Sequence, residues 1–250
     1  MNNLVIDIGN SGLKLAIFHQ RKLVHKILLQ QIDPTQVRQL VKEYEVENSL
    51  LSSVGQDAEA IANLLKTITV YQRFSSNTAL PLINEYKSPE TLGSDRLAGL
   101  MGARFIYPDQ PVLVIDAGTC ITYDLIDDKS RYEGGSISPG IQMRLKALNH
   151  FTGKLPLVDF DPDFEGLIGR DTRESILSGV INGVVAEVEG FIQKYSQRRA
   201  HLRVILCGGD ARFFDTRLKN SIFANYLSCE PDLVLIGLNE VICHQHDQKS

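Results

Sequence analysis

The chain has 250 residues, enough for one large domain or for two smaller domains that each have a core. A formal net charge of −4 gives no support for nucleic acid or an anionic membrane surface as a partner. We find no signal-peptide pattern at the N-terminus and no apolar run that we expect to span a membrane. The four cysteines lack paired spacing, which fits reduced thiols in a cytoplasmic protein better than disulfides or a zinc site.

The first predicted element is a hairpin over residues 4–18, in which two apolar strands flank a polar turn. That turn holds Asp7, Gly9, Asn10, Ser11 and Lys14. Glycine lets backbone amides approach an anion, small polar side chains donate hydrogen bonds, and a carboxylate can act on a divalent cation. The hairpin therefore predicts a site for phosphate and a divalent cation.

The elements that follow indicate an α/β domain. We predict strands over 22–29 and 49–54, an extended segment over 67–71, and helices over 34–44 and 58–66. Residues 75–89 are polar and punctuated by proline, which predicts a loop.

The next motif is Gly93-Ser94-Asp95-Arg96, followed by small and apolar residues that predict a closely packed helix. An aspartate near a helix start can cap it, with Arg96 as an ion-pair partner. It can equally serve in catalysis, and the motif alone leaves both roles open.

Residues 108–111 predict a domain junction, and the pattern of the first hairpin then returns over residues 113–126. Leu4, Val5, Ile6, Asp7 and Gly9 match Leu113, Val114, Ile115, Asp116 and Gly118 without a gap. Two unrelated hairpins explain this less well, because an unpaired aspartate at the end of a buried strand is unfavourable. We therefore predict a duplicated domain with two phosphate turns.

The remaining segments carry weaker signals. The glycine-rich segment 132–140 precedes a predicted helix over 141–149 and is either an anion-binding helix start or a plain connector. Residues 151–164 predict an irregular acidic loop, and Thr172 is expected to cap a helix running to about residue 195. A strand over 201–206 leads into the turn 207–210, which either accepts a flat nucleoside or is only a tight turn. A helix is predicted over 233–243, with a frayed tail after it.

Several nucleotide-site and hydrolase motifs are missing from the sequence. It contains no Walker A loop, no Gly-x-Gly-x-x-Gly fingerprint, no Gly-x-Ser-x-Gly elbow and no His-Glu-x-x-His helix. Their absence argues against P-loop ATPases, dinucleotide enzymes, serine hydrolases of that type and zincins.

In their order along the chain, the motifs DIGNSGLK, GSDR, DAGTCITYD, GGSISPG, GRDT and CGGD resemble those of type III pantothenate kinases. These enzymes lie within the acetate and sugar kinase, heat-shock chaperone and actin superfamily. The resemblance implies two duplicated ribonuclease H-like domains, residues 1–110 and 111–250, with a nucleotide cleft between them. It also implies ATP-dependent phosphorylation of pantothenate to 4'-phosphopantothenate, the first step of coenzyme A synthesis, by a cytoplasmic homodimer.

The resemblance assigns roles by position. The ATP-binding residues would be Asp7, Ile8, Gly9, Asn10, Ser11, Gly12, Leu13, Lys14 and Thr119. The substrate-binding residues would be Tyr86, Gly93, Ser94, Asp95, Arg96 and Thr172, with Asp95 as the catalytic base and Arg96 holding the pantothenate carboxylate. Asp116 would bind a monovalent cation, K⁺ or NH₄⁺, and Asp7 would act on Mg²⁺ through water. Ser11 stands where the family often has threonine, and Arg170 and Asp171 also depart from its usual residues.

Three other functions are compatible with such a fold. A kinase for a sugar is disfavoured by Arg96, which suits a carboxylate substrate. A nucleotide-binding regulator without turnover is disfavoured by the intact Asp7, Asp95 and Asp116. An actin-like filament protein is disfavoured by the short chain.

Overall fold

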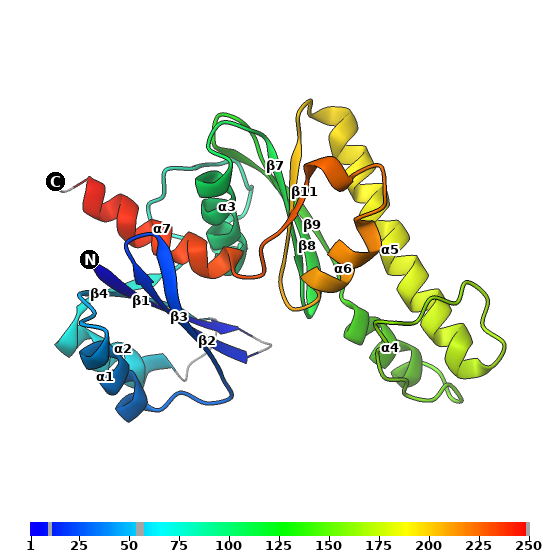
Figure 1. Ribbon diagram of the computed structural model, residues 1–250, viewed down its shortest axis with the longest axis horizontal. Coiled ribbons are helices and arrows are strands. Elements are labelled where there is room, and N and C mark those ends of the chain that lie inside the picture. Colours follow the sequence, from blue (N-terminus) through cyan, green and yellow to red (C-terminus); the bar gives the residue numbers. More distant parts are fainter. Residues whose placement is uncertain (10–11, 54–57, 249–250) are drawn as a thin grey trace. The chain divides into compact units, whose positions relative to one another are not determined.

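The computed structural model describes residues 1–9, 12–53 and 58–248 (Figure 1). The chain forms two compact units. Unit 1 consists of Met1–Pro108, Ser130–Tyr132 and Asp232–Ser250, and unit 2 of Asp109–Lys129 and Glu133–Pro231. The domain boundary expected between residues 110 and 111 stays a prediction.

Unit 1 is built on a five-stranded sheet in the order β3-β2-β1-β4-β5. Its strands are β1 (Asn2–Gly9), β2 (Gly12–His19), β3 (Lys22–Leu29), β4 (Asn48–Ser53) and β5 (Val70–Phe74). The helices α1 (Pro34–Glu43) and α2 (Glu59–Ile68) cover one face (Figure 1). On the other face lies α7 (Leu233–Asp247), which packs on α3 (Ser94–Ile106).

The alternation of side chains along β1 decides which face each residue serves. Leu4 and Ile6 enter the core beneath α1 and α2. Asn3 points the other way, where its amide donates a hydrogen bond of 2.8 Å to Asn239 of α7. Asp7 has the same parity as Asn3, so its carboxylate emerges on the face covered by α3 and α7.

The sheet of unit 2 runs in the order β11-β10-β7-β8-β9. Its strands are β7 (Val112–Ala117), β8 (Cys120–Ile126), β9 (Arg131–Pro139), β10 (Arg203–Cys207) and β11 (Leu227–Cys229). Its helices are α4 (Ile141–His150), α5 (Thr172–Arg198) and α6 (Ala211–Leu218), with the short turn η3 (Ala224–Tyr226). The first two residues of β9 belong to unit 1, where they pair with the short strand β6 (Ile83–Asn84). The short 3₁₀ turn η2 (Pro89–Thr91) follows β6 in the chain.

The two sheets repeat one topology. Each begins with three neighbouring strands in sequence, of which the first two are antiparallel. The first of these pairs in parallel with a fourth strand, which pairs in parallel with a fifth. In both units at least one helix precedes the fourth strand, and one helix lies between the fourth and fifth strands. This repetition confirms the predicted duplicated α/β fold and makes β7 the counterpart of β1.

Several local predictions were wrong. Residues 131–139 form the strand β9 rather than a connector, because pairing beside β8 overrides the low strand propensity of Gly134 and Gly135. The loop predicted over 75–89 contains the strand β6, and α7 continues to Asp247. Residues 67 and 68 belong to α2, so the predicted extended segment starts later, at Val70.

The capping of α5 also differs from the prediction. Asp171 is the N-cap, and its carboxylate accepts a hydrogen bond of 2.8 Å from the backbone N–H of Glu174. The Glu174 carboxylate in turn accepts a hydrogen bond of 2.8 Å from the backbone N–H of Arg170. Thr172 is therefore the first helical residue, and its hydroxyl is not needed as a cap.

Contrary to the expectation from the sequence, one helix, α5, is long and apolar enough by length and composition to cross a membrane. A single helix of this kind is weak evidence, because core helices of soluble proteins pass the same test. One face of α5 is buried in the core of unit 2, including Leu177, Ile181, Val184 and Val188.

Replacing Gly237 by alanine should destabilise unit 1. Gly237 of α7 lies so close to α3 that a Cβ atom would collide with the Ala98 carbonyl. We expect the free energy of unfolding in urea to fall by about 2 kcal/mol or more, because the helices must separate. As the control, Gly190→Ala on α5 meets no neighbouring atom within 4 Å and should be neutral or stabilise by up to about 1 kcal/mol. Equal stability of the two variants would contradict this account of the α3–α7 contact.

Candidate active site

The first group of predicted site residues meets at the end of β1. In the strand ladders Asp7 lies opposite Lys14 of β2 and opposite Ser52 of β4. Directly paired residues of neighbouring strands project from the same face, so these three side chains lie together. The buried Ser52 hydroxyl donates a hydrogen bond to the Asp7 carboxylate and lies 3.5 Å from the Ser94 hydroxyl.

The second group lies at the start of α3, as the sequence predicts. Gly93 is the N-cap, and Ser94, Asp95 and Arg96 form the first turn. The exposed Asp95 carboxylate accepts a hydrogen bond of 2.8 Å from the backbone N–H of Arg96. Its charge also acts on Asp7. The same Asp95 side chain therefore accepts a hydrogen bond at the start of α3 and acts electrostatically on Asp7.

Asp7 has a strongly perturbed proton affinity. Burial of its carboxylate raises its pKa to about 6 from 3.8. The Lys14 ammonium opposes this rise, the Asp95 carboxylate adds to it, and the hydrogen bond from Ser52 opposes it. A partly buried carboxylate held between a cation and a second carboxylate is typical of functional sites.

Arg96 is a buried cation on the same helix turn. Its guanidinium carbon lies 5.4 Å from the ring centroid of Tyr86 and 6.0 Å from that of Tyr132. The structure thus brings together Asp7, Lys14, Tyr86, Gly93, Ser94, Asp95 and Arg96 in unit 1. Sequence reasoning missed Ser52 and Tyr132. Ser52 could have been found as a polar residue ending a strand parallel to β1, whereas nothing in the sequence pointed to Tyr132.

The rest of the first turn is only partly described. Asn10 and Ser11, predicted ATP contacts, lie outside the described residues. Ile8 and Gly9 pair with Leu13 and Gly12 at the turn end of the hairpin. The Leu13 side chain is buried in the core, so any contact it makes with a nucleotide must use its backbone.

The counterpart in unit 2 is built around Asp116. In the ladders Asp116 lies opposite Thr122 of β8 and Cys207 of β10. Gly208 follows with φ +88°, and a Cβ there would collide with the Asp116 carboxylate and the Ala117 carbonyl. The backbone N–H of Asp210 donates a hydrogen bond of 2.9 Å to the Ala117 carbonyl. Burial raises the pKa of the Asp210 carboxylate. The predicted turn 207–210 is therefore packed directly on Asp116 and Ala117 at the end of β7.

A polar network holds the segment before α4 against the same turn. The backbone N–H of Gly140 donates a hydrogen bond of 3.0 Å to the backbone carbonyl of Thr119, whose side chain is exposed. The Arg144 guanidinium donates three hydrogen bonds: one of 2.8 Å to the Pro139 carbonyl, one of 2.8 Å to the Ser138 hydroxyl and one of 2.7 Å to the Glu187 carboxylate. Burial opposes ionisation of Glu187, but hydrogen bonds from Arg144, Ser138 and Tyr123 outweigh it and lower the pKa of Glu187. Sequence reasoning missed this network.

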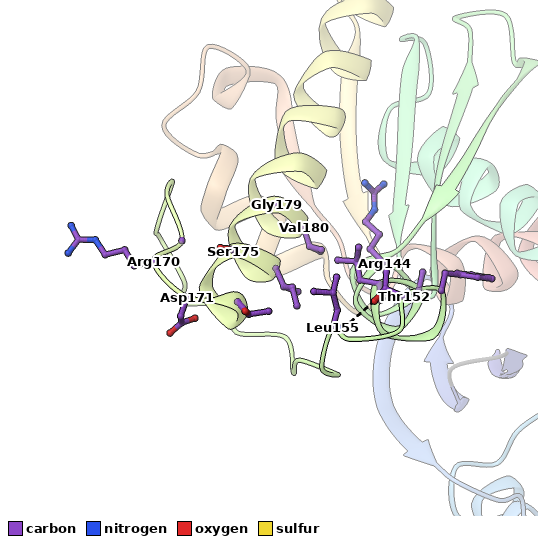
Figure 2. A pocket seen from close by; sticks show the side chains of 14 residues that line it. Arg144, Thr152, Leu155, Arg170, Asp171, Ser175, Gly179 and Val180 are labelled. Atoms are coloured by element: carbon purple, nitrogen blue, oxygen red, sulfur yellow. Dashed lines mark hydrogen bonds between the residues drawn. The ribbon is translucent and has the colours of Figure 1, made fainter.

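Thr172 lines a groove of about 1120 Å³ between α4 and the first turns of α5 in unit 2 (Figure 2). The groove is largely apolar, with Leu148, Phe151, Leu155 and Val180 among its walls. Arg170 extends away from it. Thr172 belongs to unit 2, whereas Arg96, Tyr86 and Tyr132 belong to unit 1.

Comparison with known proteins identifies the family. A family model described as type III pantothenate kinase matches residues 3–194. A type III pantothenate kinase of Bacteroides fragilis is 41% identical over 244 residues, covering 96% of this chain and 97% of the relative. The chain belongs to the type III pantothenate kinase family.

Solved structures agree on the fold of this type III pantothenate kinase. A Baf family protein from Campylobacter jejuni has a TM-score of 0.62 at 20% identity and covers 98% of this chain and 99% of its own. A ROK family protein from Streptococcus pneumoniae, in complex with sucrose, has a TM-score of 0.52 at 12% identity and covers all of both chains. At these identities the likeness concerns the duplicated ribonuclease H-like fold alone.

Asp7 is a carboxylate of the kind that could hold a magnesium ion in the kinase. Among the residues that the structure describes, no group of three or more His, Cys, Asp or Glu side chains could hold a metal. Magnesium in kinases commonly uses one or two carboxylates and keeps several waters. Asp7, with Lys14 and Ser52 beside it, matches that pattern.

The proton affinity of Asp7 can be measured in the kinase without nucleotide or metal. The side-chain ¹³C signal of Asp7 should titrate with a pKa of about 6. Because the native state holds this proton more tightly than the unfolded chain, the contribution of Asp7 to stability falls as pH rises from 3.8 to about 6. In Ser52→Ala the pKa of Asp7 should be higher still, because a hydrogen bond to the ionised form is lost. A wild-type midpoint near the ordinary value of about 4 would contradict this description of the site.

Proposed function

We propose that the protein transfers the γ-phosphoryl group of ATP to the primary hydroxyl of pantothenate, giving 4'-phosphopantothenate in the cytoplasm as the first step of coenzyme A synthesis. The observation that carries the proposal is the first turn of α3. There a carboxylate and a buried guanidinium on adjacent residues, Asp95 and Arg96, lie beside the phosphate turn at Asp7. This arrangement would supply a base and an anion-binding group next to the proposed place of the phosphoryl donor.

Proton transfer is assigned to Asp95. A base must come within hydrogen-bond reach of the hydroxyl whose proton it accepts. The Asp95 carboxylate is exposed at the helix start, so a substrate hydroxyl can reach it. Arg96 would bind the pantothenate carboxylate through two parallel hydrogen bonds. Tyr86, Gly93, Ser94 and Thr172 complete the proposed substrate contacts.

Phosphate binding is assigned to the two duplicated turns. The ATP contacts are Asp7, Ile8, Gly9, Asn10, Ser11, Gly12, Leu13 and Lys14 in the first turn and Thr119 in the second. Asp7 would act on Mg²⁺ through water, and Asp116 would bind K⁺ or NH₄⁺. The ions would offset phosphate charge, and phosphoryl transfer depends mainly on such neutralisation and on positioning. The homologous places of Asp7 and Asp116 in the two sheets support paired roles.

A homodimer is part of the proposal. The apolar groove that contains Thr172 and the exposed Leu167 and Ile168 next to it supply a surface of the kind that another subunit covers. Two alternatives remain distinct from the main proposal. A sugar-type kinase would not need the buried Arg96, and a non-catalytic regulator would not need Asp95.

Direct assay of the product tests the proposed reaction. Purified protein, ATP, Mg²⁺ and pantothenate should yield phosphopantothenate by mass spectrometry, with more product when K⁺ is added. Hexoses supplied in place of pantothenate should give no phosphorylated product. Absence of phosphopantothenate with and without K⁺ would refute the proposal, and a phosphohexose would favour the sugar-kinase alternative.

Replacing Asp95 by asparagine tests the assignment of the base. We expect kcat to fall by about 10²- to 10⁴-fold, the usual contribution of a general base. KM for pantothenate should change little, because Arg96 remains. Glu90→Gln is the matched control, since it removes one exposed carboxylate nearby on η2 and should keep normal turnover. With folding verified by circular dichroism, normal turnover in Asp95→Asn would exclude Asp95 as the base.

A further inference from the structure

Two tyrosines flank the guanidinium that we assign to substrate binding. The rings of Tyr86 and Tyr132 stack with a centroid distance of 5.8 Å and an interplanar angle of 12°. The Arg96 guanidinium carbon lies 5.4 Å from the first ring and 6.0 Å from the second. Both distances are within the range at which a cation is attracted by an aromatic face. The three side chains therefore form one cluster, the Arg96 cluster.

Burial separates the roles of the two rings. Tyr132 has no exposed surface and is among the largest fully buried side chains of the chain. Tyr86 is half-buried. A substrate can therefore reach Tyr86 and the edge of Arg96, but it cannot touch Tyr132. Any effect of Tyr132 on binding must act through its two neighbours.

The backbone ties the same residues together. β6 pairs in parallel with the start of β9, with Asn84 opposite Tyr132. The backbone N–H of Glu85 donates a hydrogen bond of 3.1 Å to the Tyr132 carbonyl. The backbone N–H of Tyr86 donates a hydrogen bond of 3.0 Å to the side-chain oxygen of Asn84. β6 lies within an otherwise irregular segment, so this short pairing anchors the loop that carries Tyr86.

The two aromatic rings contribute to the surroundings that orient Arg96. Arg96 is only 8% exposed, so its charge has lost most of its contact with water. A guanidinium binds a carboxylate through two parallel hydrogen bonds only when its plane is correctly oriented. An aromatic face stabilises the cation without using up the N–H groups that a substrate needs.

We propose that Tyr132 is a positioning residue for the carboxylate of the substrate, because its ring holds the Arg96 guanidinium and the Tyr86 ring in the orientation that binds it. This inference rests on the proposed function. It makes Tyr132 a determinant of the preference for an anionic substrate, although Tyr132 contacts no substrate atom.

The test compares Tyr132→Leu with Tyr132→Phe. Leucine removes the aromatic face, and KM for pantothenate should rise by about five- to thirtyfold, as expected for the loss of a desolvated cation–aromatic contact. KM for ATP should stay within about twofold of wild type, because the Tyr132 ring supports the group that binds the carboxylate and not the groups that bind phosphate. Phenylalanine keeps the face and should restore KM for pantothenate to within about twofold of wild type.

A neutral substrate analogue separates positioning from a general structural effect. Pantothenyl alcohol has no carboxylate, so its KM should differ little between wild type and Tyr132→Leu. The matched control is Tyr44→Leu, which removes another stacked tyrosine of unit 1, paired with His25 at 5.3 Å. It should lower thermal stability without changing KM for pantothenate.

Each outcome decides a separate point. An equal rise of KM for pantothenate and for the alcohol, or an unchanged KM for pantothenate in folded Tyr132→Leu, would overturn the positioning role. If Tyr132→Leu does not fold, Tyr132→Met, whose longer unbranched side chain can adapt to the site without an aromatic face, is assayed with the same expectations. If the wild-type protein makes no phosphopantothenate, the proposed function itself fails.

Discussion

The pairing of β1 with β4 and β2 is the constraint on which the site depends. Strand alternation places Leu4 and Ile6 of β1 under α1 and α2 and turns Asp7 toward the face on which α7 and α3 lie. The same registers bring Lys14 and Ser52 beside Asp7. A register shift of one residue would move Asp7 into the apolar core and Ile6 to the phosphate turn. The buried core of unit 1 therefore also holds its charged site in place.

Charge is distributed over the site in a way that suits phosphoryl transfer to an anionic substrate. Two carboxylates, Asp7 and Asp95, interact unfavourably, and Lys14 and Arg96 lie in the same part of unit 1. Like charges held close together are tolerated where a cation or a proton is to be bound. The close packing of α3 on α7 at Gly237 keeps the helix start that carries Asp95 and Arg96 fixed.

Much of the fold could be predicted because the repeated strand–Asp–x–Gly pattern marks β1 and β7 directly. The helix α3 and the two strand–turn segments that carry Asp7 and Asp116 followed from local sequence, and their role in phosphate binding stays a prediction. The strand β9 could not be predicted, because tertiary pairing decides it against the propensity of its glycines. Ser52 and Tyr132 were missed for a similar reason: Ser52 gains its role from a parallel register, and Tyr132 from stacking on a residue far away in the chain.

A crystal structure with pantothenate and a non-hydrolysable ATP analogue would test the central claim most directly. The account predicts the pantothenate carboxylate within about 3 Å of the Arg96 guanidinium and its primary hydroxyl within about 3 Å of an Asp95 carboxylate oxygen, both ordinary hydrogen-bond distances. It would be contradicted if the carboxylate of bound pantothenate were held by other residues, or if its hydroxyl lay out of reach of Asp95.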